Sequence, residues 1–198
     1  MANRSNLDAF REFLEQYRRL IVWAVAASAV PLAAALASMT PAWPSGIAQV
    51  TAVAQLLVLA LVFQLLRSAR RQVVSRIMVR WTIILCLLVP IYLMLIALFT
   101  YSEPISKMRF TKGFECTERA KQVFSKECPF LGTDEISTAG YEEDTLWTTR
   151  SVSAVKTLIA VLWLACFAAL SMVLGSFAVF QMGQKNKELG GRQRNRLG

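Results

Sequence analysis

The chain has 198 residues, of which 55% are hydrophobic, and its 22 lysines and arginines outnumber 13 acidic residues to give a net charge of +9. This hydrophobic share is above that of ordinary soluble domains, so the composition excludes a simple water-soluble globule. The chain contains no histidine, and it lacks both a phosphate-cradling glycine loop and a nucleophile motif. We therefore expect no enzymatic activity, no cofactor and no metal site.

Residues 1–19 are predicted to form a cytoplasmic amphipathic helix. Ser5 can cap its first turn, with Asp8 three residues later. Apolar residues then recur on one helical face: Leu7, Phe10, Leu14 and Tyr17. We interpret this helix as lying along the membrane surface, with a docking helix for a cytoplasmic partner as the alternative.

Four apolar runs follow, each close to the roughly 20 residues that an α-helix needs to cross hydrocarbon. They cover 20–40, 46–66, 82–101 and 157–181. In hydrocarbon the backbone must satisfy its own hydrogen bonds, so uninterrupted apolar runs of this kind form helices. The sequence therefore predicts an all-α membrane protein with four transmembrane helices and a small external subdomain between the third and the fourth. Transmembrane helices one to three occupy 20–101, and the fourth occupies 154–183.

Two strongly basic segments predict the orientation in the membrane. They are the arginine-rich loop 67–80 and the tail 184–198. Lysine-rich and arginine-rich segments stay in the cytoplasm, so both termini are predicted to be cytoplasmic, in a plasma or inner membrane. Anionic lipids are the expected partners of the loop arginines, because cationic side chains beside a membrane attract their headgroups: Arg67, Arg70, Arg71, Arg76 and Arg80. Nucleic acid is not an expected partner, since no binding fold accompanies these charges.

The connection "TPAWPSG" at 40–46 is long enough only for a tight turn between the first two spans. Trp43 in this turn suits the outer membrane interface, where tryptophan is enriched. Trp147, shortly before the fourth span, fits the same interfacial belt. We therefore expect both indoles to anchor the chain at the headgroup level.

Cys116 and Cys128 lie in the predicted external subdomain, 102–153, which carries nine acidic and seven basic residues. An external location is oxidising and favours a disulfide. A straight helix over 116–128 would separate the two α-carbons by roughly 18 Å, whereas a disulfide spans at most about 7 Å. A bridge therefore requires a short helix near 117–124 followed by a return before Pro129. Intermolecular bridges, a metal site and a redox pair are the alternatives, and the last two fit poorly without histidine or a two-residue spacing.

The external subdomain has few hydrophobic residues, and they are scattered along it: Met108, Phe110, Phe114, Val123, Phe124, Phe130, Leu131, Ile136, Leu146 and Trp147. A core of this size is too small to be secure on its own. We therefore expect the subdomain to depend on a disulfide staple, on the membrane helices or on a partner.

The four spans contain no ionisable residue near their centres, and their central polar residues are neutral: Ser28, Gln55, Tyr92 and Ser171. These could form one hydrogen-bonded intramembrane layer if the helices face inward together. Ser171 and Gly175 are four residues apart and are expected to form a helix-packing face, either within the chain or between copies. Cys86 and Cys166 are expected to act as small hydrophobic residues.

Three functions are compatible with this pattern. The leading hypothesis is a non-enzymatic four-span membrane protein that associates with other membrane proteins as an accessory subunit or scaffold. The alternative is a homo-oligomeric pore or membrane-perturbing effector, built from copies of this chain. A thiol-redox membrane enzyme that uses Cys116 and Cys128 is the third. The absence of an acid–base constellation favours the first two.

Overall fold

The computed structural model describes residues 22, 29–36, 39–66, 69–102, 109–124, 127–140 and 142–194, and within these ranges it leaves the side chains of 133, 135 and 182–194 undescribed. Its contacts divide the chain into two compact units. The first unit comprises Met1–Ser38, Ala48–Cys86 and Phe167–Gly198. The second unit comprises Met39–Ile47 and Leu87–Cys166.

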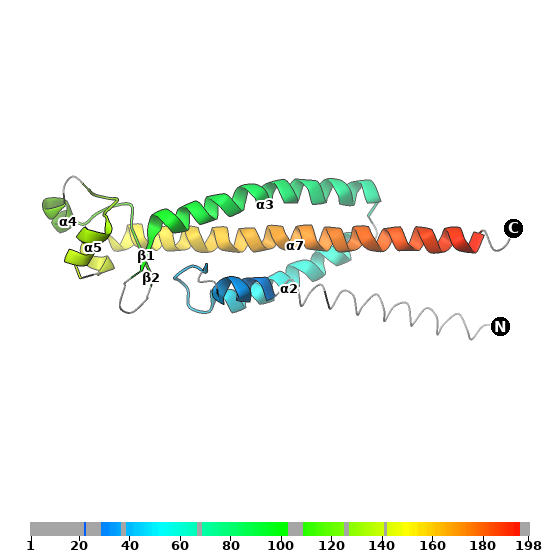
Figure 1. Cartoon of the computed structure of the whole chain (residues 1–198), viewed down its shortest axis with the longest axis horizontal. Helices are drawn as coiled ribbons and strands as arrows, with labels where there is room; N and C mark the ends of the chain where they lie inside the picture. Colours follow the sequence, from blue (N-terminus) through cyan, green and yellow to red (C-terminus); the bar gives the residue numbers. More distant parts are fainter. Residues whose placement is uncertain are drawn as a thin grey trace. The chain divides into compact units, whose positions relative to one another are not determined.

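The described chain is mostly helical, and three of its helices are long and apolar enough to cross a membrane. They are α2 (Ile47–Leu66), α3 (Arg71–Phe99) and α7 (Thr149–Arg194), which appear as the long ribbons in Figure 1. The first predicted span is described only at 22 and 29–36, where the chain is helical. The predicted amphipathic helix, 1–19, lies outside the described residues.

The helices extend beyond the predicted boundaries in two places. The predicted loop 67–80 is helical from Arg71 onward, because α3 begins there. Its arginines alternate with valine, isoleucine and methionine in "RQVVSRIMVR", and arginine is itself a good helix former, so nothing in the segment stops the helix. At the other end of the chain, α7 begins at Thr149 and continues through the predicted tail to Arg194. The distribution of charge therefore did not predict where these helices begin and end.

In the first unit, α2 and α7 pack closely at Gly175. A Cβ added there would lie 2.7 Å from Val62 Cγ1 and 3.4 Å from Leu59 Cδ1. Because Gly175 has no side chain, α7 can approach α2 at this point. Val62 also forms a buried cluster with Leu66 and with Val74 of α3.

The second unit contains a short antiparallel hairpin directly after α3. It consists of β1 (Thr100–Ser102) and β2 (Arg109–Thr111), with Tyr101 paired opposite Phe110. The two rings stack with centroids 5.6 Å apart, which is a stabilising cross-strand pair. These strands depart from the predicted all-α class. They are three residues each, too short for a period of two to stand out in the sequence.

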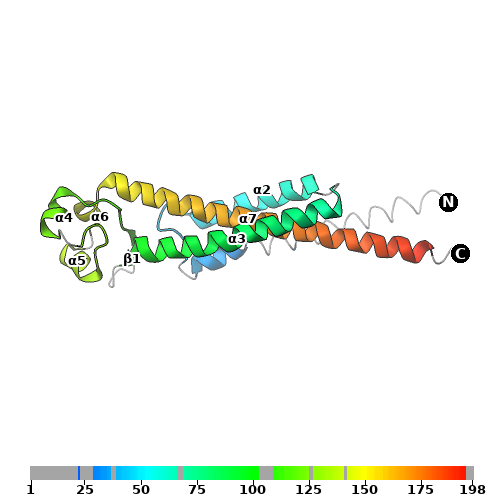
Figure 2. The same cartoon turned by 90° about the horizontal axis from the view of Figure 1, so that it is seen from above.

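Three short helices follow the hairpin: α4 (Glu118–Val123), α5 (Thr133–Thr138) and α6 (Glu143–Leu146). Helix α4 begins where Thr117 caps it, since the Thr117 hydroxyl accepts a hydrogen bond from the Ala120 amide at 3.2 Å. The short helices gather beside the strands and the start of α7 (Figure 2). We call the described part of residues 100–152 the disulfide module.

The disulfide module has its own hydrophobic core. Its buried members come from the short helices, the segments beside them and the start of α7: Cys116, Ala120, Leu131, Ile136, Leu146, Trp147 and Val152. Other apolar residues of the module remain largely exposed, namely Phe114, Val123 and Phe130. The core is therefore small, as predicted, but it is closed around one large side chain.

Candidate functional site

Cys116 and Cys128 form a disulfide within the chain, as the sequence predicted. Their α-carbons are 6.2 Å apart, a separation that the end of α4 at Val123 and the turn before Pro129 make possible. Cys116 is only 3% exposed and pairs with Trp147 in an isolated β-bridge. The disulfide therefore holds the segment that contains α4 against the core of the module.

Trp147 does not occupy the predicted interfacial belt. Its side chain is 0% exposed, and its indole Nε1 donates to the Pro129 carbonyl at 3.1 Å. Gly113 runs across it so closely that an added Cβ would lie 2.7 Å from Trp147 Cβ. In the sequence, an indole next to an apolar span resembles a membrane anchor. In the structure, the large apolar surface of this indole is buried in the small core of the module.

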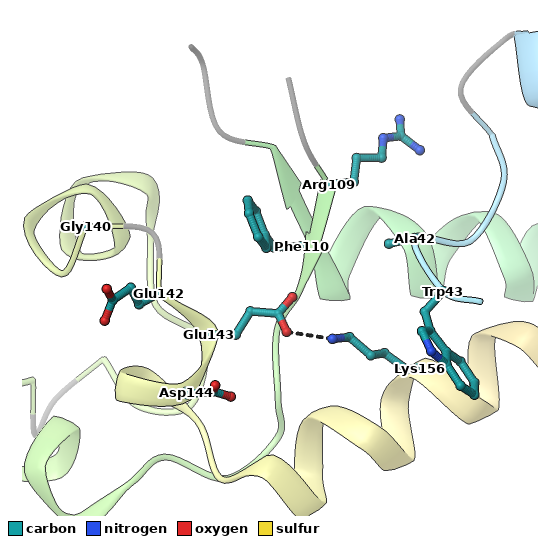
Figure 3. Close-up of a pocket in the computed structure, with 9 residues that line it drawn as sticks. All are labelled: Ala42, Trp43, Arg109, Phe110, Gly140, Glu142, Glu143, Asp144 and Lys156. Atoms are coloured by element: carbon teal, nitrogen blue, oxygen red, sulfur yellow. Dashed lines mark hydrogen bonds and ion pairs between the residues drawn. The ribbon is translucent and has the colours of Figure 1, made fainter. Parts of the chain in front are cut away.

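A cavity of about 740 Å³ lies on the disulfide module. The residues that line it come from the turn before α2, from strand β2, from Gly140 and Glu142, from the start of α6 and from the second turn of α7. Figure 3 shows the side chains that line this cavity: Ala42, Trp43, Arg109, Phe110, Gly140, Glu142, Glu143, Asp144 and Lys156. From the sequence alone, the acidic residues are expected only as part of the external subdomain, and this cavity is not predicted.

Glu143 joins the walls of the cavity. One of its carboxylate oxygens accepts from the Thr111 amide at 2.8 Å, and the other accepts from Lys156 Nζ at 2.6 Å. Figure 3 shows the Glu143 and Lys156 side chains pointing toward one another. Their side chains are 15% and 27% exposed, so this ion pair is better shielded from water than an ordinary surface pair. Glu143 therefore connects β2 to α7 and neutralises Lys156.

Three charged groups on the cavity wall are not engaged in this way. Glu142, Asp144 and Arg109 are exposed, and their side chains form no ion pair or hydrogen bond among the residues that the structure describes. Arg109 lies on the opposite side of Glu143 from Glu142 and Asp144 in the view of Figure 3. Within the part of the chain that the structure describes, the cavity wall thus has two carboxylates and one guanidinium that form no ion pair.

Tyr101 lies beside this site, in strand β1 beyond the end of α3. Burial raises the pKa of its phenol above the ordinary value, and the negative charge of Glu143 acts in the same direction. The phenol therefore stays neutral at physiological pH. It contributes its ring to Phe110 and Trp147 and adds no charge to the cavity wall.

The predicted intramembrane polar layer is not joined by hydrogen bonds among the described residues. Tyr92 donates to the Met39 carbonyl at 2.7 Å, and Ser171 donates to the Phe167 carbonyl of its own helix at 2.9 Å. Ser28 lies outside the described residues. Gln55 is 2% exposed, and neither its Oε1 nor its Nε2 has a partner in the part of the chain that is described. The three described residues of this set, Gln55, Tyr92 and Ser171, therefore do not form one hydrogen-bonded layer.

Replacing Gln55 by methionine is expected to stabilise the first unit. The change removes a buried amide that has no hydrogen-bond partner among the described residues and keeps an unbranched side chain, so the desolvation cost of about 1–3 kcal/mol is relieved. The measurement is the thermal midpoint of the detergent-solubilised protein. Gln64→Met is the matched control, because Gln64 is exposed on the same helix. A lower midpoint for Gln55→Met than for the control would contradict the prediction.

The remaining predicted positions are placed as follows. Gly175 packs against α2 of the same chain, and Ser171 is fully buried on α7. Of the five loop arginines, Arg67 lies outside the described residues, and the others are exposed: Arg70, Arg71, Arg76 and Arg80. The Arg71 guanidinium also lies 4.4 Å from the centroid of the Phe180 ring, a cation–π contact between α3 and α7 in the first unit.

In the described residues, no group of three or more His, Cys, Asp or Glu side chains is placed to hold a metal ion. Comparison of the chain with models of protein families, with curated proteins and with solved structures finds no match. Function is therefore argued from the arrangement of the residues themselves.

Proposed function

We propose that this chain is a non-enzymatic four-span integral membrane protein that associates with other membrane proteins, as an accessory subunit or scaffold. The first span is the apolar run 20–40, which completes an even number of crossings. Both termini are cytoplasmic, and the disulfide module lies on the opposite, oxidising side. The exposed arginines at the start of α3 and the closed disulfide both support this placement.

The main support for association with other membrane proteins is that the spans differ in how much of each is buried inside the chain. In their most apolar windows, 44% of α7 is buried inside the chain but only 6% of α3. Large apolar side chains therefore cover the outside of α3, among them Ile83, Leu87 and Met94 at 56%, 60% and 65% exposure. In a bilayer, only lipid tails or another apolar helix can cover such a surface, and helices associate there through close packing.

The disulfide module supports the same function from the other side of the membrane. Phe114 and Val123 are 54% and 68% exposed, and neither belongs to the buried core of the module. Large apolar side chains on the surface of a small rigid module suit contact with a protein partner. Burial of Cys116 at 3% exposure also favours a structural disulfide over thiol exchange.

Photo-crosslinking in the native membrane tests this proposal. A photoreactive residue at position 87 of α3, and separately one at position 114 of the module, is expected to capture the same heterologous integral membrane protein. That protein should also co-purify in a fixed ratio in mild detergent. Position 57 of α2 is the matched control, since Leu57 is 68% exposed on a different span.

Two results would contradict the association with other proteins. Adducts of twice the 22.1 kDa chain mass, together with ion conductance in liposomes, would favour the homo-oligomeric pore. Adducts to lipid alone at both positions would indicate a chain without a stable partner.

Cysteine-accessibility mapping tests the orientation, because a reagent confined to the outer side should reach a cysteine introduced at position 118.

A further inference from the structure

The loop 129–131 of the disulfide module presents an exposed aromatic ring on a fixed backbone. Phe130 is 65% exposed, whereas the next residue, Leu131, is 0% exposed in the core of the module. The Pro129 carbonyl accepts a hydrogen bond from the Trp147 indole at 3.1 Å, and the disulfide lies directly before it in the chain. The backbone is therefore held on both sides of Phe130, while the ring itself remains outside the core.

Lys112 connects this loop to the last residue of α3. Its backbone amide donates to the Phe99 carbonyl at 2.7 Å, and its Nζ donates to the Leu131 carbonyl at 2.8 Å. The rings of Phe99 and Phe130 are also paired, with centroids 6.3 Å apart. All four residues belong to the second unit. The exposed ring of Phe130 is therefore positioned at the end of α3.

The end of α3 is also where the hydrocarbon is expected to end, if α3 crosses the membrane as proposed above; the inference below rests on that proposed function. The last charged residue before the apolar run of α3 is Arg80. From Thr82 to Phe99 the helix rises roughly 26 Å at about 1.5 Å per residue, close to the roughly 30 Å thickness of hydrocarbon. Leu98 is 45% exposed beside Phe99. An exposed apolar surface therefore continues from the last turn of α3 to Phe130.

We propose that Phe130 inserts into the lipid leaflet next to the disulfide module, at the boundary between acyl chains and headgroups. Lipid is the occupant because the ring continues the surface of α3, whose most apolar window is only 6% buried inside the chain. A phenyl ring has no hydrogen-bonding group, so its transfer from water to an apolar environment is favourable without a specific partner. The inserted ring anchors the module at a point outside the helices and thereby limits how far the module can tilt on the membrane surface.

The lipid contact is assigned to Phe130 and not to every exposed apolar residue of the module. Phe114 is 54% exposed, and Val123 is 68% exposed at the end of α4, which packs on α6. Among the pairs of aromatic rings in the described residues, Phe130 pairs with Phe99 of α3, whereas Phe114 takes part in none. Phe114 is therefore a matched comparison: the same residue type, in the same module, without the contact with α3.

Photo-crosslinking of the purified full-length protein in nanodiscs tests the proposal. Each disc holds one chain in phosphatidylcholine, and a photoreactive phenylalanine replaces Phe130 or, in the matched control, Phe114. Position 130 is expected to give about tenfold more lipid adduct than position 114, because burial of a phenylalanine side chain favours the inserted state by at least that factor. Mass mapping identifies the adducts and verifies that each variant contains the disulfide.

A smaller probe makes the test independent of the bulk of the photoreactive group. Cyanophenylalanine replaces Phe130, and separately Phe114, in the same nanodiscs. The infrared stretch of the nitrile is expected at the frequency of an apolar environment at position 130 and at the frequency of a hydrated nitrile at position 114. A hydrated nitrile at position 130 would overturn the proposal.

Two crosslinking results would also overturn the proposal. One is an equal yield of lipid adducts from positions 130 and 114. The other is an adduct in native membranes between position 130 and a heterologous protein in place of lipid, since a protein would then cover the ring. Crosslinking from position 87 is run on the same membranes. Lipid adducts at position 130 without a captured partner at position 87 would refute the proposed association and support the lipid contact, and the reverse result would refute the lipid contact alone.

Discussion

Replacing Trp147 by alanine is expected to destabilise the disulfide module by about 3–5 kcal/mol, the usual cost of removing a large buried aromatic side chain. The indole is 0% exposed and is the largest of the seven buried side chains in this core. Few other apolar residues could move into the space, because the module is small. We expect the module to open locally while the membrane helices stay folded.

Hydrogen exchange of the detergent-solubilised protein measures this effect. The amides of Thr117 and Thr148 report on it directly, because they bond to Leu146 and Glu115 across the core. Trp43→Ala is the matched control: it removes the same side chain from a 51% exposed position and should leave protection unchanged. Unchanged protection of Thr117 and Thr148 in Trp147→Ala would mean that the core does not depend on the indole.

Trp147→Phe separates packing from hydrogen bonding at the same position. A phenyl ring keeps much of the apolar contact but cannot donate to the Pro129 carbonyl, which the indole does at 3.1 Å. The expected loss is therefore smaller, about 1–3 kcal/mol for a buried carbonyl without its donor. Equal losses for phenylalanine and alanine would assign the whole effect to the hydrogen bond.

Removing the disulfide is expected to cost the module about 3 kcal/mol, since the bridge closes a short loop and restricts the unfolded chain. Cys116→Ser with Cys128→Ser avoids leaving a single reactive thiol. The expected result is faster proteolysis between the hairpin and α7, and wild-type protein treated with reductant should behave in the same way.

The control for this prediction is Cys86→Ser, which removes an exposed free thiol from α3. It should not change the rate of proteolysis. A double serine variant that resists protease as well as the wild type would show that Trp147 and its neighbours hold the module without the bridge. The predictions for Trp147 and for the disulfide are therefore linked, because these changes act on the same core.

The sequence predicted those features of the fold that depend on length and composition. Apolar runs at 46–66, 82–101 and 157–181 fall within α2, α3 and α7 apart from one or two residues at the ends. The two cysteines in a charged segment predicted the bridge and the short helix between them, because the reach of a disulfide excludes a straight helix over 116–128. The length of an apolar run and the reach of a disulfide are properties of a single segment, so they can be applied to one sequence without knowledge of the tertiary structure.

Features that depend on tertiary packing were not predictable in the same way. Trp147 beside an apolar span looks like an interfacial anchor, and only the closed module reveals that it is a core residue. The cavity was missed because Trp43, Arg109 and Lys156 come from segments far apart in the sequence. Glu143 could not be separated from Glu142 and Asp144 by composition, although it alone has both carboxylate oxygens engaged.

The positions of the core residues in the sequence determine when the disulfide module can fold during synthesis. Ser151 and Val152, which open α7, are 0% and 4% exposed in the module that contains Cys116. A nascent chain that ends at Gly140 already contains both cysteines but lacks Trp147 and the residues that position the bridge. Until the start of α7 has left the ribosome, this core cannot close around the two cysteines, and their thiols remain free to pair wrongly. The beginning of the last helix is therefore the piece that completes the module during biogenesis.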